Sequence, residues 1–412
     1  MEVKMRTAPR EGTRTYVRVS DFYVNNELKP VELGRLLWEH RELFLGGEGK
    51  SVTAPDALAR VVPGRLLRGA RVGRLVLQYQ QARSRGNGSV DSLEAPVTGD
   101  LAIRRKPGAI KILDDSNRRV YTYVPESEAE RSKLQERVEL HQELAGLPFA
   151  PALHEVDLDA GYAAEEFVAG IHPQNFAGCK DDFTDIYRGL LLQFLQARRP
   201  QWVEGRGYLE SLRRDILSPD GLLYRMPSDQ RRTVALFVRD ICDNLRSFEG
   251  RVPLVLSHGD YFSGNILLSG DRQLAIDWAN LGYRTPLHDL YYLYLNHCTR
   301  TLDQPNLQRR LGIAADRLRS GLAQDARELH AELEGFLRPS NELRWLFYLE
   351  CVQVPLVRCA SPDDRYIASM LERIGWFREY EEGLRFSADA APLPPNATLS
   401  GATLGSAGAD GG

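Results

Sequence analysis

Residues 257–268 constrain the fold of this chain more than any other stretch. They read Ser-His-Gly-Asp-Tyr-Phe-Ser-Gly-Asn-Ile-Leu-Leu, and an Ile-Asp-Trp triplet centred on Asp277 follows. The polar groups at His258, Asp260, Asn265 and Asp277 are each preceded or followed by apolar residues of the kind that form short buried strands. We expect the strand after Asn265 and the strand before Asp277 to pair as a hairpin, which brings both side chains to its open end.

The composition limits the class of protein. A chain of 412 residues with 43% apolar and 26% charged residues is expected to form a packed soluble core, either as two lobes or as one core with extensions. A net charge of -3 argues against a nucleic-acid partner. The five cysteines are scattered and contain no Cys-x-x-Cys pair, which argues against a disulfide framework or a zinc site and favours a reducing compartment.

Targeting signals are also not evident. No apolar run approaches the ~18 residues that a membrane helix needs, and residues 1–6 lack the apolar centre of a signal peptide. We therefore expect a cytoplasmic protein that does not insert into a membrane. The oligomeric state is left open.

Residues 96–170 predict a small antiparallel α+β lobe. Short strands alternate with turns, and one helix begins with acidic residues, as the helix dipole favours. The expected strands are 101–103, 109–113, 119–124, 152–156 and 162–168, and the expected helix is 126–145.

Residues 171–387 predict a mostly helical lobe, and the break at residues 170–173 is the expected hinge. The expected helices are 182–198, 202–217, 228–248, 287–296, 314–337 and 341–357. Residues 388–412 are rich in Ala, Gly, Ser and Pro, which predicts a disordered tail. Residues 1–95 show one short strand at 15–19, one helix at 31–44 and a Gly-rich polar loop at 83–89; we expect an accessory or partly disordered extension.

The polar residues of the central stretch are those that phosphoryl transfer requires. This reaction needs an oriented hydroxyl, metal ions on the phosphates and positive charge to hold them. Asp260 stands where a carboxylate would accept the proton of the hydroxyl. Asn265 and Asp277 offer the hard oxygen atoms that Mg²⁺ prefers. His258 is expected to brace the loop by hydrogen bonding.

Residues 258–260 (His-Gly-Asp), Asn265 and residues 276–278 (Ile-Asp-Trp) together resemble the aminoglycoside phosphotransferase and choline kinase family, over about residues 98–375. The resemblance implies a bilobal protein-kinase-like α+β fold with a small β-rich N-lobe and a mostly helical C-lobe. It also implies ATP, or GTP, with Mg²⁺ as cofactors, and a small-molecule hydroxyl acceptor as partner.

The resemblance also assigns individual roles. It makes Asp260 the catalytic base, with Asn265 and Asp277 as metal ligands. Glu166 and Val168 belong to the strand before the hinge, whose backbone would meet the adenine ring. Asp289 resembles a family residue that supports the catalytic loop, although a simple helix cap explains it equally well.

The sequence departs from the family at the lysine that holds the phosphates. That lysine belongs on the third strand, where residues 121–123 read Tyr-Thr-Tyr. Lys111 lies on the preceding strand, and a tight turn at 114–117 would place it roughly opposite Val120 and on the face that it shares with Thr122. From there it could reach the same phosphates, an arrangement that resembles the "with no lysine" protein kinases.

The sequence is less specific about the glutamate that would pair with Lys111 and about the loop that would cover the phosphates. Glu136, Glu139 and Glu143 share one helix face, and of the three we take Glu139 as the partner. No Gly-x-Gly-x-x-Gly loop is present; the turn at residues 105–108, with Lys106, is a weak substitute.

Three functions remain open. The first is a small-molecule kinase acting on a sugar, an aminoglycoside, an amino alcohol or a surface-polysaccharide precursor. The second is a protein kinase, against which the Ile-Asp-Trp triplet and the short segment between Asp277 and Asp289 argue. The third is a nucleotide-binding pseudokinase that serves as a scaffold, which the missing third-strand lysine favours and the retained Asp260, Asn265 and Asp277 oppose.

Overall fold

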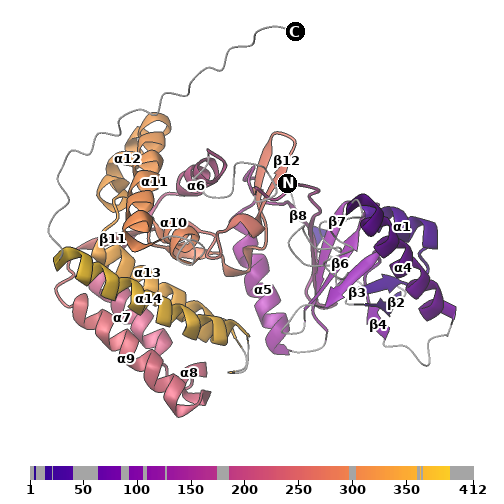
Figure 1. The fold of residues 1–412 in the computed structure, drawn as a ribbon, viewed down its shortest axis with the longest axis horizontal. Helices are drawn as coiled ribbons and strands as arrows, with labels where there is room; N and C mark the ends of the chain where they lie inside the picture. The colour runs from indigo at the N-terminus through magenta and orange to yellow at the C-terminus, as the bar shows by residue number, and fades with distance from the viewer. Residues whose placement is uncertain are drawn as a thin grey trace, which may run out of the picture.

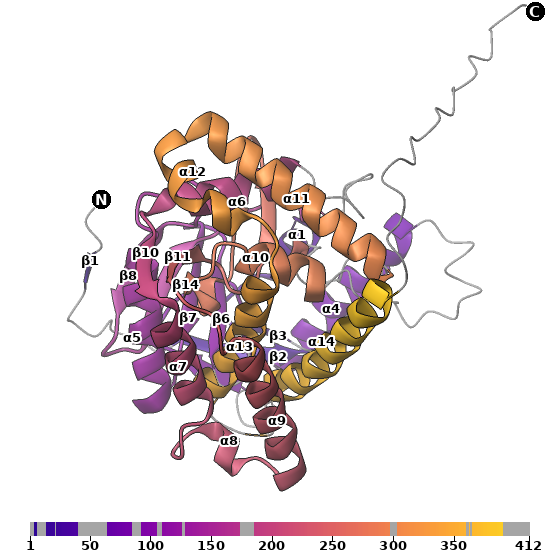
Figure 2. The same ribbon diagram turned by 90° about the vertical axis from the view of Figure 1, so that its left-hand side faces the viewer.

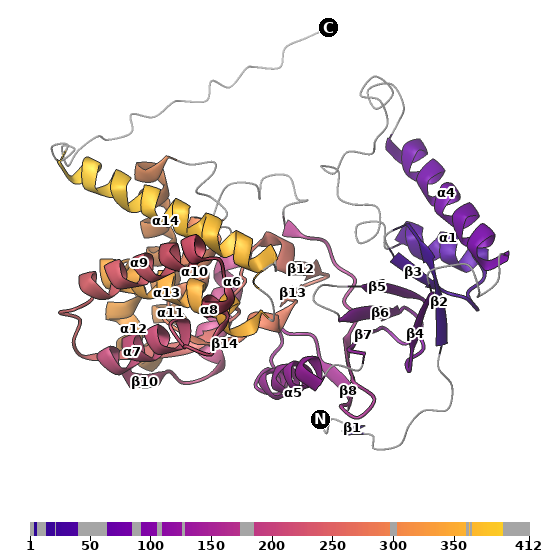
Figure 3. The ribbon, with the colours of Figure 1, turned by 90° about the horizontal axis from the view of Figure 1, so that it is seen from below.

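The computed structural model describes residues 4–5, 14–20, 22–39, 64–84, 92–104, 109–125, 128–173, 185–296, 303–359, 362 and 365–389. These residues form a β-rich lobe and a helical lobe that lie side by side (Figure 1). This is the bilobal α+β fold that the sequence predicts. Seen from below, helix α5 (Glu128–Gln142) and the hairpin of β12 (Ile266–Ser269) and β13 (Arg272–Ala275) lie where the two lobes meet (Figure 3).

The strands fall into one large sheet and two small ones. Their bounds are β1 Lys4–Met5, β2 Arg14–Val19, β3 Phe22–Asn25, β4 Ser92–Ala95, β5 Leu101–Arg104, β6 Ile110–Asp114, β7 Arg119–Tyr123, β8 Leu153–Asp157, β9 Tyr162–Glu166, β10 Gln201–Glu204, β11 Arg251–Ser257, β12 Ile266–Ser269, β13 Arg272–Ala275 and β14 Gly282–Arg284.

The helices lie mainly in the second half of the chain. Their bounds are α1 Pro30–Glu39, α4 Gly64–Ser84, α5 Glu128–Gln142, α6 Asp185–Ala197, α7 Gly205–Ile216, α8 Leu222–Arg225, α9 Ser228–Asn244, α10 His288–Tyr291, α11 Gln304–Asp325, α12 Arg327–Leu333, α13 Asn341–Arg358 and α14 Arg365–Asp389. A π-helical turn, η4 Tyr292–Asn296, follows α10, and short 3₁₀ turns lie at η2 Ser263–Asn265, η3 Trp278–Asn280 and η5 Glu334–Leu337.

The large sheet runs through both the N-lobe and the preceding extension. Its order is β1-β8-β9-β7-β6-β5-β3-β2-β4, so β5 lies between β6 and β3. Leu33 of α1 and Tyr79 of α4 pack in one core with Leu101, Leu113 and Phe167. The described part of residues 1–95 therefore shares a sheet and a core with the N-lobe, and a functional boundary at residue 95 stays a proposal.

The register of β6 and β7 differs from the expected one. Lys111 pairs directly with Thr122, and Leu113 pairs with Val120. The prediction that Lys111 lies opposite Val120 was wrong by two residues, because β6 continues to Asp114 and the turn occupies residues 115–118. A shift of two residues keeps side chains on the same face of a sheet, so Lys111 and Thr122 still share a face.

The helical lobe has its own large core, which α6, α7, α9, α11, α13 and the loops around β11 enclose. Helix α14 lies along α13 and α9 (Figure 2). Residues 202–204, expected in a helix, instead form β10 and pair with β11. The helix expected at 314–337 begins at residue 304 and breaks at Ala326, and the helices α4 and α14 were not predicted.

The hinge region connects the lobes through the β12–β13 hairpin. Ile171 forms an isolated bridge with Leu268, with both N–H···O distances at 2.9 Å. Arg272 of β13 binds both carboxylate oxygens of Glu166 at the end of β9, at 2.8 and 3.2 Å. The hairpin is therefore attached to both ends of the chain segment that links the lobes.

Several predictions lie wholly or largely outside the described residues. They are the turn at 105–108, residues 85–89 of the expected loop, residues 40–44 of the expected first helix, and all but the first two residues of the tail at 388–412. In the part of the chain that the structure describes, no helix is both long enough and apolar enough to cross a membrane.

Candidate active site

A cavity of about 620 Å³ lies between the lobes, a size typical of small-molecule sites. One wall comes from β5, β6 and β7, and a second from α5 and the hinge. The opposite wall comes from the loop at residues 258–265, the catalytic loop, and from the β12–β13 hairpin. A further wall comes from α10, α13 and α14. The predicted residues that line it are Lys111, Glu166, Val168, Asp260, Asn265 and Asp277.

Asp289 holds the start of the catalytic loop. Its buried carboxylate accepts hydrogen bonds from the Ser257 hydroxyl at 3.1 Å, the His258 amide at 2.8 Å and the Gly259 amide at 2.9 Å. Three donors directed at one carboxylate fix the path of the backbone just before Asp260. These are contacts that a supporting residue would make, and the role that the resemblance assigned to Asp289 stays a prediction.

His258 connects the catalytic loop to the strand before Asp277. Its Nε2 lies 2.9 Å from the Ile276 carbonyl, and its Nδ1 lies 3.3 Å from the Asp260 amide. A neutral ring with the proton on Nε2 satisfies both contacts. The ring is buried and packs against Trp278 at 4.5 Å. Both ring nitrogens of His258 are therefore engaged with the backbone of the loop and of the strand before Asp277.

Asp260, Asn265 and Asp277 meet at the open end of the hairpin. Asn265 donates from Nδ2 to the Asp260 carbonyl at 2.9 Å and to its carboxylate at 3.1 Å. Ile266 pairs with Ala275, so Asn265 and Asp277 lie at the end of the ladder, as the sequence predicts. Asp277 adopts a left-handed conformation with φ of 62°, which is unusual for a residue other than glycine and common at functional sites.

The donors at this end suit a hard divalent cation. Because the amide nitrogen of Asn265 faces Asp260, its Oδ1 is left as an oxygen donor. Among the described residues, Asp277 makes no hydrogen bond or ion pair. Magnesium in such sites takes one or two protein oxygens and completes its shell with phosphates and water. The pair Asn265 and Asp277 therefore fits Mg²⁺ held together with a phosphate group.

Two residues that the sequence did not single out, one in contact with Asp260 and one behind it, lie beside this carboxylate. The Tyr292 hydroxyl hydrogen-bonds Asp260, and burial together with the negative charge of Asp260 raises the pKa of Tyr292 well above its usual value. Arg373 of α14 donates to the same hydroxyl at 2.9 Å. Tyr292 opens the π-helical turn η4, a feature enriched at functional sites. No periodic or motif signal marks either residue.

Lys111 lies in an electrostatic cluster with a different glutamate from the one predicted. Glu165 of β9 lines the cavity beside Lys111, and Arg137 of α5 lies 3.2 Å from the Glu165 carboxylate. Burial opposes ionisation of Glu165, but the charges of Lys111 and Arg137 outweigh it and lower the pKa of this carboxyl to about 2. The buried hydroxyl of Thr122, directly opposite Lys111, has no hydrogen-bond partner among the described residues.

Glu139 does not fit the role of partner to Lys111. Its side chain is exposed, does not line the cavity and accepts a hydrogen bond from Gln135 at 2.9 Å. The apolar residues Leu134 and Val138 turn the other face of α5 towards the sheet. This rotation directs Arg137 to the cavity and Glu139 to solvent.

An apolar slot leads from the hinge into the cavity. Val120 of β7 and Leu267 of β12 are among the residues that line it, and Phe167 and Val168 form its edge. Glu166 also lines the cavity, but its carboxylate is bound by Arg272. Its side chain is therefore engaged in joining the lobes, and its backbone N–H donates to the Ala152 carbonyl at 2.7 Å.

Comparisons with known proteins complete the description. No curated protein matches the sequence. Similar solved structures include a choline kinase from Streptococcus pneumoniae (14% identity, 68% of this chain and 89% of that chain, TM-score 0.39). A glucosamine kinase in complex with glucosamine, ADP and inorganic phosphate is also similar (14% identity, 69% and 80% covered, TM-score 0.39). So is a thermostable mutant of the aminoglycoside phosphotransferase APH(4)-Ia with AMP-PNP and hygromycin B (14% identity, 68% and 92% covered, TM-score 0.41).

The family comparison covers the catalytic loop, the hairpin and most of the N-lobe described above. The model of the phosphotransferase enzyme family matches residues 108–331, which is more than half of the chain. The match includes Asp260, Asn265 and Asp277, the three residues that the structure brings together at the cavity. This chain is therefore a member of the phosphotransferase enzyme family.

Proposed function

We propose that this protein transfers the γ-phosphate of ATP to a hydroxyl group of a small molecule, with Mg²⁺. One observation carries the proposal: Asp260, Asn265, Asp277 and Lys111 all line a single cavity between the lobes. Phosphoryl transfer is mainly a matter of positioning and charge stabilisation, and these four side chains supply the base, the metal ligands and the phosphate cation.

The nucleotide fits the N-lobe side of the cavity. The apolar slot beside Phe167 would take the base, and the backbone of Val168 at the hinge would hydrogen-bond its edge. Backbone recognition of this kind suits ATP and also admits GTP. Lys111 would bind the phosphates from the strand next to the usual one.

The acceptor hydroxyl would lie against Asp260. This carboxylate takes the hydroxyl proton, while the Tyr292 hydroxyl and the Asn265 amide hold its oxygens in place. Magnesium held by Asn265 and Asp277 would neutralise charge on the phosphate oxygens.

A nucleotide-binding scaffold is the second candidate, because Thr122 stands where the family lysine is expected. The protein-kinase function is less well supported. Strand β14 begins at Gly282 and α10 at His288, which leaves little chain between Asp277 and Asp289 for a peptide-binding activation segment.

Magnesium-dependent formation of ADP tests the proposal. The wild-type protein should turn over ATP in the presence of a hydroxylated acceptor, and Asp260→Asn should reduce the rate by about a thousandfold or more, because it removes the base and a charge at the reacting centre. Nucleotide binding, measured by calorimetry, should survive in Asp260→Asn, which separates lost chemistry from lost folding.

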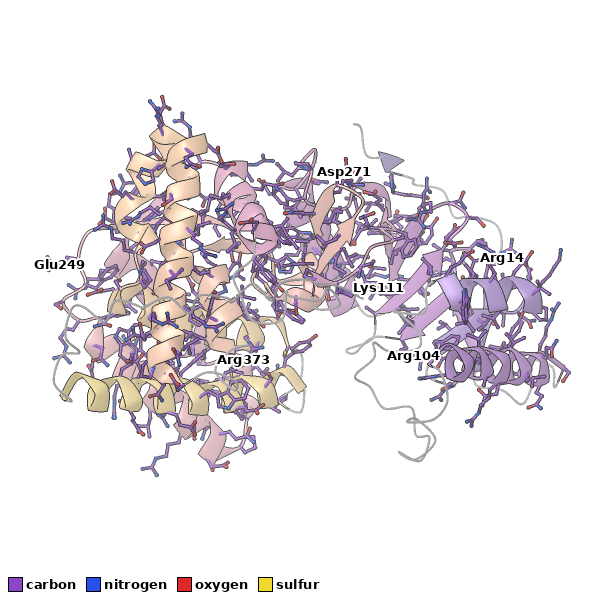
Figure 4. All side chains as sticks on the ribbon, turned by 45° about the horizontal axis from the view of Figure 1, so that its top comes forward. Arg14, Arg104, Lys111, Glu249, Asp271 and Arg373 are labelled. Carbon is purple, nitrogen blue, oxygen red and sulfur yellow. The ribbon has the colours of Figure 1, made fainter. Side chains whose placement is uncertain are left out.

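Asp271→Asn is the matched control. Asp271 is exposed at the turn of the β12–β13 hairpin and does not line the cavity (Figure 4). Full activity in Asp260→Asn would contradict the mechanism, and nucleotide binding without turnover in the wild type would support the scaffold instead.

A further inference from the structure

One end of the cavity, beyond Asp260, is formed by two helices of the C-lobe. Helix α13 contributes Cys351, Pro355 and Arg358, spaced at i, i+4 and i+7, and α14 contributes Tyr366 and Arg373, seven residues apart. These spacings place each set on one helix face, because two helical turns take about seven residues. We call this surface, formed by one face of α13 and one face of α14, the acceptor end of the cavity.

Arg373 brings to this end a positive charge that forms no ion pair with a carboxylate of the described residues. Its guanidinium donates to the Tyr292 hydroxyl at 2.9 Å and covers the ring of Tyr292 at 5.2 Å from the centroid. Within the described part of the chain it has no ion pair. Burial opposes the charge of Arg373, but the neighbouring Tyr292, Cys351 and Asp260 outweigh it and raise its pKa. A largely buried guanidinium without an ion pair is costly unless a ligand supplies the counter-charge.

Arg358 adds a second positive charge with weak compensation. It donates to the Leu281 carbonyl at 3.3 Å, and its nearest carboxylate in the described residues is Glu136, at 3.9 Å. The Glu136 side chain is 63% exposed, so solvent screens this ion pair. Burial, followed by repulsion from Arg284, lowers the pKa of Arg358, which indicates a local excess of positive charge.

Among the lining residues that the structure describes, the carboxylates near this end are already engaged. Asp260 and Asp277 belong to the transfer chemistry. Glu350 is fully buried and accepts hydrogen bonds from the Thr285 amide and hydroxyl, the Tyr208 hydroxyl and His288. The aromatic face of Tyr292 is covered by Arg373. The exposed carboxylate of Glu136 also lines this end and faces Arg358 at 3.9 Å, and the ring of Tyr292 is covered, so the two arginines outnumber the open carboxylates here.

We infer that the acceptor of this phosphotransferase carries an anionic group, a carboxylate or a phosphate ester, which Arg358 and Arg373 bind while Asp260 faces the hydroxyl. The inference rests on the proposed function and specifies its substrate class. Guanidinium groups bind both kinds of oxyanion by two parallel hydrogen bonds, so the shared chemistry is a pair of anionic oxygens on one atom.

The test uses compounds that share a carbon skeleton and differ in charge. The full-length protein with ATP and Mg²⁺ is offered glucuronate, glucose 6-phosphate, glucose and glucosamine, together with a wider library of hydroxylated compounds sorted by charge. ADP release above the acceptor-free rate is measured, and products are identified by mass spectrometry. Stimulation by anionic compounds is the expected result, and the carboxylate and phosphate arms distinguish the two sources.

Arg358→Glu then tests the residue. For an anionic acceptor we expect kcat/KM to fall by at least about tenfold, the change expected from losing one charged hydrogen bond. The KM for ATP should stay within about twofold, since the acceptor contact alone is altered. Arg358→Lys should restore part of the acceptor affinity, and Arg232→Glu, an exposed arginine of α9 away from the cavity, should behave like the wild type.

Different results would refute the anionic acceptor and the proposed phosphotransferase function. Stimulation confined to neutral or cationic compounds, or an unchanged charge preference in Arg358→Glu, would overturn the acceptor assignment while ATP turnover through Asp260 persists. Acceptor-free ATP hydrolysis that is intact but not raised by any anionic compound would also overturn it. Turnover that does not depend on Asp260 would instead refute the proposed function itself.

Discussion

Gly259 shows at the residue scale why the catalytic loop has its sequence. Its φ is +76°, a conformation that glycine adopts freely and other residues rarely do. A Cβ at this position would lie 2.4 Å from the Asn280 carbonyl oxygen and 2.7 Å from Arg284. The loop therefore turns towards Asp260 only because residue 259 has no side chain.

Replacement of Gly259 by alanine should disturb the site. We expect Gly259→Ala to destabilise the fold by about 1–3 kcal/mol and to lower kcat, because the loop must move to relieve the clash. Chemical denaturation and steady-state kinetics measure the two effects. Gly270→Ala, at the hairpin turn with φ of +60° but with open space around it, is the control for backbone strain alone. Equal losses of kcat in both variants would contradict the steric argument.

The hydroxyl of Tyr292 is the second residue-scale test. Tyr292→Phe keeps the ring and removes the group that contacts both Asp260 and Arg373. A hydrogen bond to a charged group contributes about 1.5–3 kcal/mol, so kcat should fall by about 10- to 100-fold. The KM for ATP should change little. An unaltered kcat would show that Asp260 does not depend on this contact.

Glu165 makes a prediction about pH. Its pKa falls from 4.5 to about 2 in the folded protein, so the unfolded chain binds a proton first as the pH drops. The stability from this carboxylate is therefore complete above pH 4.5 and is lost as the pH falls towards 2. Urea unfolding at pH 7 and pH 3 should show a smaller loss of stability in Glu165→Gln than in the wild type.

Glu249→Gln is the control for Glu165→Gln. Glu249→Gln alters an exposed carboxyl (Figure 4) and should show the same acid sensitivity as the wild type. If Glu165→Gln and Glu249→Gln respond to pH alike, Glu165 does not hold the charge that its surroundings indicate.

At the element scale, strand register decides which side chain reaches the phosphates. Lys111 on β6 and Thr122 on β7 lie directly opposite each other and on one face of the sheet. A lysine on either strand would therefore project into the same part of the cavity. We therefore propose that Lys111 supplies, from the neighbouring strand, the cation that the third strand lacks.

An exchange between the two strands tests this argument. Lys111→Ala should raise the KM for ATP or lower kcat, by about tenfold for the loss of one phosphate contact. Adding Thr122→Lys to Lys111→Ala should restore part of the activity, because the new lysine starts from the facing position. The double variant Lys111→Ala with Arg119→Lys, on the same strand, is the control. The register argument would be contradicted if Thr122→Lys and Arg119→Lys restored activity equally, or if neither restored it.

Helix α5 shows what periodicity cannot determine. The spacing of Glu136, Glu139 and Glu143 places them near one face, but it does not say which way that face turns. Packing of Leu134 and Val138 on the sheet sets the rotation. The partner of Lys111 then comes from β9, a strand that is distant in sequence and adjacent to β7 in space.

At the scale of the whole molecule, the described part of residues 1–95 and the N-lobe share one core. Leu33 of α1 is fully buried with Leu101, Leu113 and Phe167, and the last of these borders the hinge. A defect in the extension should therefore reach the nucleotide site.

Leu33→Ala measures this coupling. We expect a loss of about 2–5 kcal/mol, as for other large-to-small core substitutions, and a weaker affinity for ATP. Val31→Ala, on the exposed face of the same helix, should change neither quantity. Thermal unfolding with and without nucleotide gives both values. Unchanged ATP affinity in a destabilised Leu33→Ala protein would show that the extension is a separate unit.

The sequence by itself determined the catalytic half of the site. The residues around Asp260, Asn265 and Asp277 are close in the chain, so short strands and a tight loop are sufficient to bring them together. The residues that surround them come from distant segments: Glu165 from β9, Tyr292 from a π-helical turn, and Arg358 and Arg373 from the last two helices. Only tertiary packing decided these contacts, because helix rotation and strand register depend on the whole core and not on local spacing.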